Sequence, residues 1–237
     1  MLSFEEAVEY HADICQCGYS SLHLAARYGY KQLALSLIRK GARVNDQGRN
    51  GATPVHEAAC HNQPGLILLL THPNIGGDIN SKTRNGSTPL HSAAVCGAVE
   101  VIDYLLYMKA NRTALDDYGL TALHYSILNI KPKQPGMPFF LNGSRSNGTL
   151  LNLVDRRGHL SAIFKDKKEI KNADRLHWLD TLLKLITRGS DVDAVDRFGR
   201  TALHYAAYNG LADAVNVLLQ GNATSEKQDK DGKTPLE

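Results

Sequence analysis

The sequence has little net charge and no long apolar run, and each shortage excludes a class of function. Its 237 residues carry 27 Lys and Arg against 24 Asp and Glu, a formal net charge of +3. That small excess makes nucleic acid the less favoured partner. No apolar run reaches the roughly 20 residues that span a bilayer, and Met1-Leu-Ser-Phe-Glu-Glu6 lacks the basic start of a secretory signal. We therefore expect no membrane insertion by this segment and an intracellular, cytoplasmic location, with the nucleus as an alternative.

Cysteine is also scarce, which argues against a disulfide framework. The sequence has only four: Cys15, Cys17, Cys60 and Cys96. We expect them to be the reduced residues of an intracellular protein. The first two, with His11 and His23, raise the question of zinc. One residue separates those cysteines and no second pair follows, which fits structural zinc spacing poorly. No metal and no cofactor is expected.

The sequence does have a strong internal repeat, the first feature to settle in such a chain. Its clearest copy reads Gly199-Arg-Thr-Ala-Leu-His-Tyr-Ala-Ala-Tyr-Asn-Gly210. Close copies begin at Gly51 and Gly86, weaker ones begin at Gly18 and Gly119, and a truncated one begins at Gly232. The hydrophobic fraction of 43% is enough for a continuous core. The sequence stops inside a copy, so we infer a piece of a longer protein.

The repeated pattern Gly-x-Thr-Pro-Leu-His-x-Ala-Ala, followed by Leu-Leu-x-x-Gly-Ala and Val-Asn, resembles the ankyrin repeat over nearly the whole chain. The resemblance implies an all-α repeat solenoid, an ankyrin-type stack of helix–turn–helix units joined by β-hairpin-like loops. It also implies a single domain over residues 1–237. Function in such a stack is not fixed by the fold alone.

Local chemistry supports the same plan for each unit. A turn glycine permits a positive φ, Thr or Ser caps the first helix, and Pro fits its first turn because no N–H is needed there. The Ala-Ala pair lets helices approach closely. A second helix carries long aliphatic residues and ends at Gly41, Gly189 or Asn222, which tolerate the left-handed conformation.

The spacing of the turn glycines sets the expected units. Glycines 18, 51, 86, 119, 199 and 232 are spaced by 33, 35, 33, 80 and 33 residues. The long gap could hold one unit with an insertion of 47 residues. Asp155-Arg-Arg-Gly158 instead favours two stretched units, so we place units near 18, 51, 86, 119, 158, 199 and 232. Residues 1–17, with a helical pattern over 2–13, would cap the N-terminal end.

Within the long gap we expect a short helix over 161–168 and a strong second helix. Its shared face would hold Leu176, Leu179, Leu182, Leu183 and Ile186. Residues 130–175 otherwise look like an irregular basic excursion or degenerate units. Residues 131–175 hold ten basic and four acidic residues, a net charge of +6.

The basic excursion has two interpretations. The first is a solvated surface segment. The second is a basic contact for an acidic partner, or a site for a phosphate-rich ligand or nucleic acid. The residues that would serve the second are Lys131, Lys133, Arg156, Arg157, Lys165, Lys167 and Lys168.

Five of the ten histidines recur at one position of the repeat, which argues against catalysis. They are His23, His56, His91, His124 and His204. Catalytic groups converge on one pocket, whereas these recur along the chain. We expect each ring to bond to the backbone of the adjoining turn. No set of nucleophile, base and orienting group is present, so an enzyme is not expected.

The resemblance instead implies protein binding at a concave face, lined by the hairpin tips and the ends of the first helices. Exposed Tyr, Phe and Arg on a rigid tip suit interface hot spots. The predicted partner-binding residues are Arg49, Arg84, Tyr118, Arg197, Phe198, Tyr208, Tyr28 and His61. We expect a non-catalytic module that binds a partner protein or peptide as scaffold, adaptor or substrate receptor. Asn45 and Asn80 occupy positions where, by the same resemblance, an asparaginyl hydroxylase could act.

Overall fold

The computed structural model describes residues 18–48, 50–128 and 172–236, and these residues form ten helices and no β-strand. The N-terminal half holds α2 (Ser21–Arg27), α3 (Lys31–Arg39), α4 (Pro54–Cys60), α5 (Pro64–Leu70), α6 (Pro89–Cys96) and α7 (Val99–Tyr107). The C-terminal half holds α8 (Ala122–Leu128), α9 (Asn172–Thr187), α10 (Ala202–Tyr208) and α11 (Ala212–Gln220).

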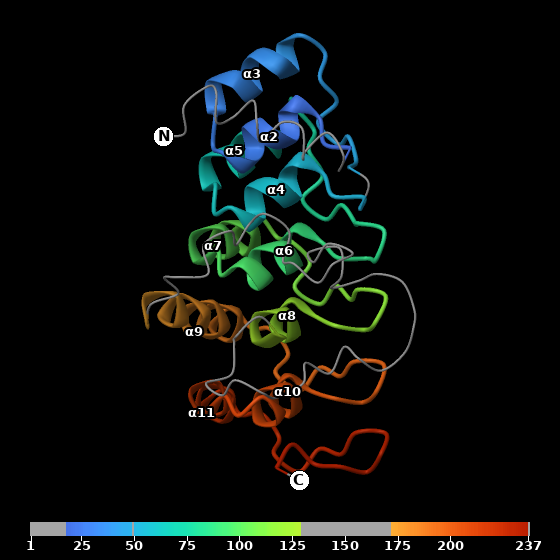
Figure 1. The fold of residues 1–237 in the computed structure, drawn as a ribbon, viewed down its shortest axis with the longest axis vertical. Helices are drawn as coiled ribbons and strands as arrows, with labels where there is room; N and C mark the ends of the chain where they lie inside the picture. Colours follow the sequence, from blue (N-terminus) through green and yellow to red (C-terminus); the bar gives the residue numbers. More distant parts are fainter. Residues whose placement is uncertain (1–17, 49, 129–171, 237) are drawn as a thin grey trace.

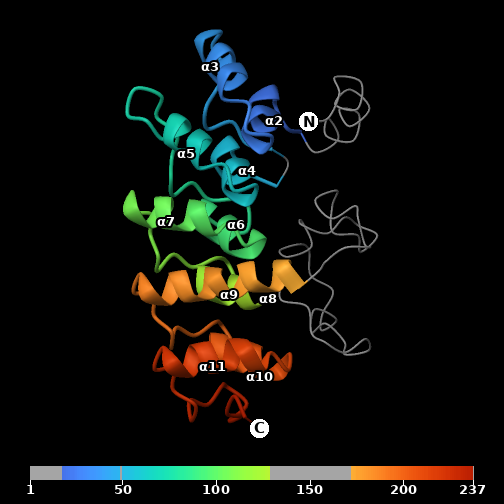
Figure 2. The same ribbon diagram turned by 90° about the vertical axis from the view of Figure 1, so that its left-hand side faces the viewer.

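The helices stack in pairs along the long axis of the molecule, from α2 and α3 at one end to α10 and α11 at the other (Figure 1). The first helices of the pairs (α2, α4, α6, α8 and α10) lie beside loops that all project to the same side. The second helices lie on the opposite side, where Figure 2 shows them facing the viewer. The expected all-α repeat stack is confirmed.

The first helices begin where the sequence predicts. Thr53, Thr88 and Thr201 each cap a first helix as the first partner of a capping box, and Pro54 and Pro89 follow at the first turn. The third residue of each helix is the repeated histidine, which completes the box in place of the usual Glu or Gln. Helices of seven or eight residues are too short to be stable alone, so packing must hold them.

The core lies between the two helix layers and is continuous along the stack. Its alanine pairs let neighbouring first helices approach closely, and those of α2, α4 and α6 are fully buried: Ala25, Ala26, Ala58, Ala59, Ala93 and Ala94. In α10, Ala206 is fully buried and Ala207 only partly. Leucine and isoleucine side chains from the second helices fill the space between layers, as Ile67, Leu70, Ile102 and Leu105 do. Burying each such aliphatic side chain stabilises the fold by roughly 2 kcal/mol. This burial is the main favourable contribution to the free energy of folding.

The turn at the start of each unit depends on glycine. Gly51 has φ +80°, and a Cβ there would lie 2.6 Å from the backbone nitrogen of Arg84 in the next unit. Gly119 has φ +78°, and a Cβ there would lie 3.0 Å from the backbone nitrogen of Arg197 in the next hairpin. Positive φ at Gly41, Gly189 and Asn222 likewise ends the second helices, as predicted.

The structure corrects the division of the long gap. The N–H of Arg197 donates to the carbonyl of Tyr118 at 3.0 Å, so the hairpins that begin at Gly119 and Gly199 are direct neighbours. Helix α9 packs against α8 and against the second helices α7 and α11. It is therefore the second helix of the unit that starts at Gly119, and no unit starting at Gly158 separates these hairpins. The long segment joins the two helices of one unit.

The buried face of α9 also differs in part from the prediction. Leu182 is fully buried as expected, but Leu183 is 41% exposed and Leu185 takes the buried position instead. Leu182 and Leu185 are three residues apart, which puts them on one side of a helix, while Leu183 is turned by about 100°. The predicted helices over 2–13 and 161–168 lie outside the described residues.

Candidate partner-binding surface

The hairpin tips of successive units are joined by backbone hydrogen bonds, which fixes their spacing. One N–H in each tip donates to a carbonyl in the tip before it: Arg84 to Asn50, Asp117 to Asn85, Arg197 to Tyr118 and Lys230 to Phe198, at 2.9, 2.9, 3.0 and 2.9 Å. The side chains of Arg84, Arg197 and Lys230 are exposed. They share one position of the repeat with Asp117, which is also exposed and lies between Arg84 and Arg197 along the stack, so the described tips present three cations and one anion at this position.

Buried aspartates hold the shape of two tips. Asp196 Oδ1 accepts the N–H groups of Phe198 and Arg200, at 2.8 and 2.9 Å, and its Oδ2 accepts the hydroxyl of Tyr205 at 2.6 Å. Asp116 is bound in the same way one unit earlier: to the N–H groups of Tyr118 and Leu120, at 2.9 and 2.8 Å, and to the hydroxyl of Tyr125 at 2.9 Å. Such carboxylates fix the backbone before any partner arrives.

The pKa values of the two aspartates are shifted in opposite directions, and Arg200 lies beside only one of them. Burial raises the pKa of Asp116, and its hydrogen bonds offset this only in part. Burial also acts on Asp196, but the bonds from Tyr205 and Arg200 outweigh it and hold the pKa of Asp196 below its usual range. The guanidinium of Arg200 lies 2.9 Å from the Asp196 carboxylate, whereas Leu120 occupies the equivalent position beside Asp116.

Arginine and aromatic side chains stack at the C-terminal tips. The guanidinium of Arg200 lies 4.5 Å from the ring centroid of Phe198 and 4.7 Å from that of Tyr205. In the same tip, Arg197 lies 5.7 Å from the ring of Tyr118 in the preceding unit. Phe198 is 54% exposed although its backbone and one ring face are held. A large exposed ring that is already ordered loses little entropy on binding.

The predicted residues at the first-helix ends lie where the sequence places them. Tyr28 and His61 are the C-cap residues of α2 and α4, and both are half-buried. Tyr208 is the last residue of α10 and is 48% exposed. Exposed aromatic residues at both a tip and a helix end of the same unit make the unit that begins at Gly199 the strongest candidate.

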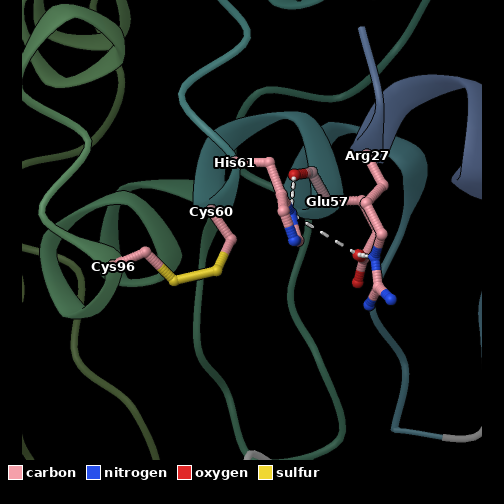
Figure 3. The surroundings of a disulfide bond; sticks show 5 residues. All are labelled: Arg27, Glu57, Cys60, His61 and Cys96. Atoms are coloured by element: carbon pink, nitrogen blue, oxygen red, sulfur yellow. Dashed lines mark hydrogen bonds and ion pairs between the residues drawn. A yellow bond between two sulfur atoms is a disulfide. The ribbon is translucent and has the colours of Figure 1, made fainter. Parts of the chain in front are cut away.

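A buried ion pair that the sequence analysis missed joins α2 to α4 (Figure 3). The Nε of Arg27 donates to the carboxylate of Glu57 at 3.0 Å, and both side chains are about one-tenth exposed. His61 adds a bond from its ring to the Glu57 carbonyl at 3.0 Å. Burial alone would raise the pKa of Glu57, but the Arg27 charge and its other partners hold that pKa below the usual range. Burial lowers the pKa of His61.

The expectation of reduced cysteines is wrong for Cys60 and Cys96. They form a disulfide between the ends of α4 and α6, with a Cα–Cα distance of 5.2 Å (Figure 3). Their separation of 36 residues, close to one repeat period, was a signal that the sequence offered. Cys15 and Cys17 lie outside the described residues.

The five repeated histidines are structural, as predicted. In each unit a backbone N–H of the capping residue donates to Nδ1, and Nε2 donates to a carbonyl of the next hairpin. Those carbonyls belong to Ala52, Ser87, Leu120, Arg200 and Lys233. This pattern requires the neutral ring with its proton on Nε2. Burial accordingly lowers the pKa of His56, His91 and His124 to about 4.

Asn45 and Asn80 tie successive loops together. The amide of Asn45 donates to the Gly76 carbonyl and its oxygen accepts the Asp78 N–H, both at 2.9 Å. The oxygen of Asn80 accepts the N–H of Asn111 at 2.9 Å. Their hydroxylation stays a prediction.

Several predicted residues lie outside the described part of the chain. They are Arg49 among the tip residues, and Lys131, Lys133, Arg156, Arg157, Lys165, Lys167 and Lys168 of the basic excursion. In the described part, no group of three or more His, Cys, Asp or Glu residues could hold a metal ion. The described helices also include none that is both long and apolar enough to span a membrane.

Comparison with known proteins gives the same picture. The family model described as "Ankyrin repeats (3 copies)" matches residues 3–83, 66–141 and 174–237. Curated relatives include neurogenic locus notch homolog protein 1 of Xenopus laevis, 31% identical over 121 residues, and of Homo sapiens, 31% identical over 116. These matches cover 51% and 49% of this chain but only 5% and 4% of the relatives' length. The chain therefore belongs to the ankyrin-repeat family, whose members are generally protein–protein interaction modules.

Proposed function

We propose that this chain is a non-catalytic module that binds a partner protein or peptide on the concave face of the stack. It would act as the scaffold, adaptor or substrate-receptor part of a larger intracellular, cytoplasmic protein. The proposed contact residues are the exposed tip and helix-end residues, with Arg197, Phe198 and Tyr208 at their centre. Arg84 and Tyr118 extend that surface along the tips.

The observation that carries this proposal is that Phe198 is exposed and at the same time held in one position. Its ring is more than half exposed, yet the Asp196 carboxylate holds its N–H and the Arg200 guanidinium covers one face. Aromatic and arginine anchors of this kind dominate binding energy at protein interfaces. The hydrogen bonds between tips add rigidity, so the surface loses little conformational entropy when it binds.

The three cations among the four described residues at one tip position favour a partner segment that carries carboxylates. Arg84, Arg197 and Lys230 lie at the same position of three units, and each is exposed, while the exposed Asp117 fills that position in the unit between Arg84 and Arg197. Charges spaced this way raise the rate of encounter with an acidic surface and fix its register. Such an effect weakens as salt is added.

Quantitative affinity capture tests the proposal. The described surface is altered in one variant by Arg197→Ala, Phe198→Ala and Tyr208→Ala. A control variant removes three exposed side chains from the second helices by Tyr107→Ala, Leu183→Ala and Leu219→Ala. We expect the first variant to lose specific proteins that wild type and the control both retain. Hydrogen exchange on the reconstituted complex should then show protection over residues 196–208.

Equal recovery of the same proteins by both variants would reject the surface. Protection confined to the second helices would place the binding site on the opposite side of the stack.

A further inference from the structure

We propose that Cys60 and Cys96 form a reversible thiol–disulfide site that clamps the junction between α4 and α6 when oxidised and releases it when reduced. The two residues end their helices, and their Cα atoms lie 5.2 Å apart. That distance is within the range that a disulfide bridges without moving the backbone. Both residues are half-buried rather than sealed in the core, so a reductant can reach the pair.

The preceding junction shows that this place in the repeat is used to clamp units together. Arg27 in α2 and Cys60 in α4 each lie four residues after the buried histidine of their unit. His61 and Cys96 each lie five residues after it. Between α2 and α4 the Glu57 carboxylate bridges the equivalent pair, Arg27 at 3.0 Å and His61 at 3.9 Å. The Arg27–Glu57 ion pair, with the His61 ring beside it, thus closes one junction where a covalent bond closes the next.

The junction between α4 and α6 has other contacts that do not depend on sulfur. His56 Nε2 donates to the Ser87 carbonyl at 3.1 Å, and the Arg84 N–H donates to the Asn50 carbonyl at 2.9 Å. Val55 and Leu90 are buried at the same interface. These contacts survive reduction, so the stack stays folded and only the helix ends are released. That is the condition for a reversible site rather than a purely structural bond.

The disulfide is also connected to the candidate partner surface. His61 follows Cys60 directly and bonds the Glu57 carbonyl at 3.0 Å, while Glu57 holds Arg27 (Figure 3). Freedom at Cys60 therefore reaches His61, one of the predicted contact residues. This last link rests on the proposed function, whereas the thiol–disulfide site itself does not.

The chemistry needs a thiol reductant such as glutathione or a dithiol protein. Its thiolate attacks one sulfur, the Cys60–Cys96 bond breaks, and the displaced cysteine leaves as a thiolate that takes a proton. A second thiol of the reductant then attacks the mixed disulfide, releases the other cysteine, and leaves the reductant as a disulfide. Two electrons and two protons pass to the pair, and glutathione disulfide reverses the reaction. In reducing compartments, disulfides are mainly transient or redox-sensing.

The test uses the full chain equilibrated in buffers with graded ratios of glutathione to glutathione disulfide. Free thiols are alkylated, and mass spectrometry measures the fraction of peptide in which Cys60 is linked to Cys96. We expect that fraction to fall as glutathione rises, without loss of helical circular dichroism. Hydrogen exchange at the ends of α4 and α6 and at His61 should rise on the order of tenfold on reduction, and α10 and α11 should not change.

Two variants complete the test. Cys60→Ser/Cys96→Ser should behave like the reduced protein in every buffer, and Cys15→Ser/Cys17→Ser should titrate like wild type. Absence of the linked peptide in oxidised protein would overturn the proposal. A disulfide that persists in excess glutathione while the protein stays folded would also overturn it. Hydrogen-exchange rates that are the same in the oxidised and reduced protein would do so too. No partner is involved, so the outcome is independent of the binding experiment.

Discussion

The Nε2 of His124 donates a hydrogen bond to the carbonyl of Arg200, 3.2 Å away in space and 76 residues away along the chain. In the other units the same bond spans 29 or 31 residues. The contact that joins neighbouring units is therefore kept across the long segment. That segment adds chain within a unit and leaves the order of units intact.

We predict that the long segment between α8 and α9, together with the first six residues of α9, can be removed without loss of the stack. In the last complete unit, Asn209 and Gly210 connect Tyr208 to Leu211, the N-cap residue of α11. Replacing residues 129–177 with Asn-Gly copies that connection. Closing a shorter loop costs less entropy, so the free energy of unfolding should stay equal or rise by roughly 2–3 kcal/mol. Urea denaturation followed by circular dichroism measures this, and a loss of cooperative unfolding would contradict it.

The buried histidines make the protein sensitive to acid. The pKa of His56, His91 and His124 is about 4 in the folded chain, against 6.5 when unfolded. Below pH 6.5 the unfolded chain binds more protons, so stability is fully present above that pH and is lost as pH falls toward 4. Three such sites give a slope of about 4 kcal/mol per pH unit near pH 5. Denaturant titrations from pH 7 to pH 4.5 measure it.

Salt separates this effect from surface charge. Exposed carboxylates are screened at 1 M salt, whereas the buried rings are not. The pH slope should therefore persist in high salt. A slope that vanishes there would assign the acid sensitivity to the surface instead.

The Arg27–Glu57 pair should matter more than the exposed ion pairs. Glu57→Gln leaves the guanidinium of Arg27 buried without its counter-charge, which costs about 3 kcal/mol or more. The matched control is Asp103→Asn on α7, which weakens the bonds to Lys184 of α9 and to Arg188 directly after it. Those side chains are 28–50% exposed, so the control should cost no more than about 1 kcal/mol. Equal losses of stability in chemical denaturation would contradict the assignment.

Arg200→Leu should convert the Asp196 tip into a copy of the Asp116 tip. Without the guanidinium, burial dominates, and the pKa of Asp196 should rise above that of an ordinary aspartate. Carbon-13 NMR titration of the aspartate carboxyls measures this directly. The same variant uncovers one face of Phe198, so its ring resonances should lose dispersion. An unchanged pKa would mean that the hydrogen bond from Tyr205 is sufficient alone.

Much of the fold could be predicted from the sequence because its signals are local and repeat. Threonine, proline and histidine at fixed spacing specify a capped helix, and the same spacing predicted the bond from each ring to the next hairpin. The unit boundaries failed at Asp155-Arg-Arg-Gly158, where a turn-like stretch matches the true turn at Asp196-Arg-Phe-Gly199. A local resemblance does not show which hairpins are neighbours in the stack. That is decided by contacts between hairpins, such as the hydrogen bond from the Arg197 N–H to the Tyr118 carbonyl.

The candidate site was less predictable for a different reason. The repeat predicts where the hairpin tips lie along the sequence. It does not predict which residues of neighbouring units each side chain contacts. Glu57 occupies a position that other units fill with Leu24, Ser92 or a tyrosine, and only the fold shows that Arg27 meets it. Cys60 and Cys96 lie at different positions of their units, so their pairing follows from the offset between neighbouring helices.

The disulfide between Cys60 and Cys96 makes the stack mechanically uneven. When the two ends are pulled apart, the load passes through the unit junctions in series, and most of these are held by hydrogen bonds and packing. The boundary between α4 and α6 carries a covalent link and cannot part under a force that separates the others. Extension should therefore begin elsewhere, and reduction would make this boundary yield like its neighbours.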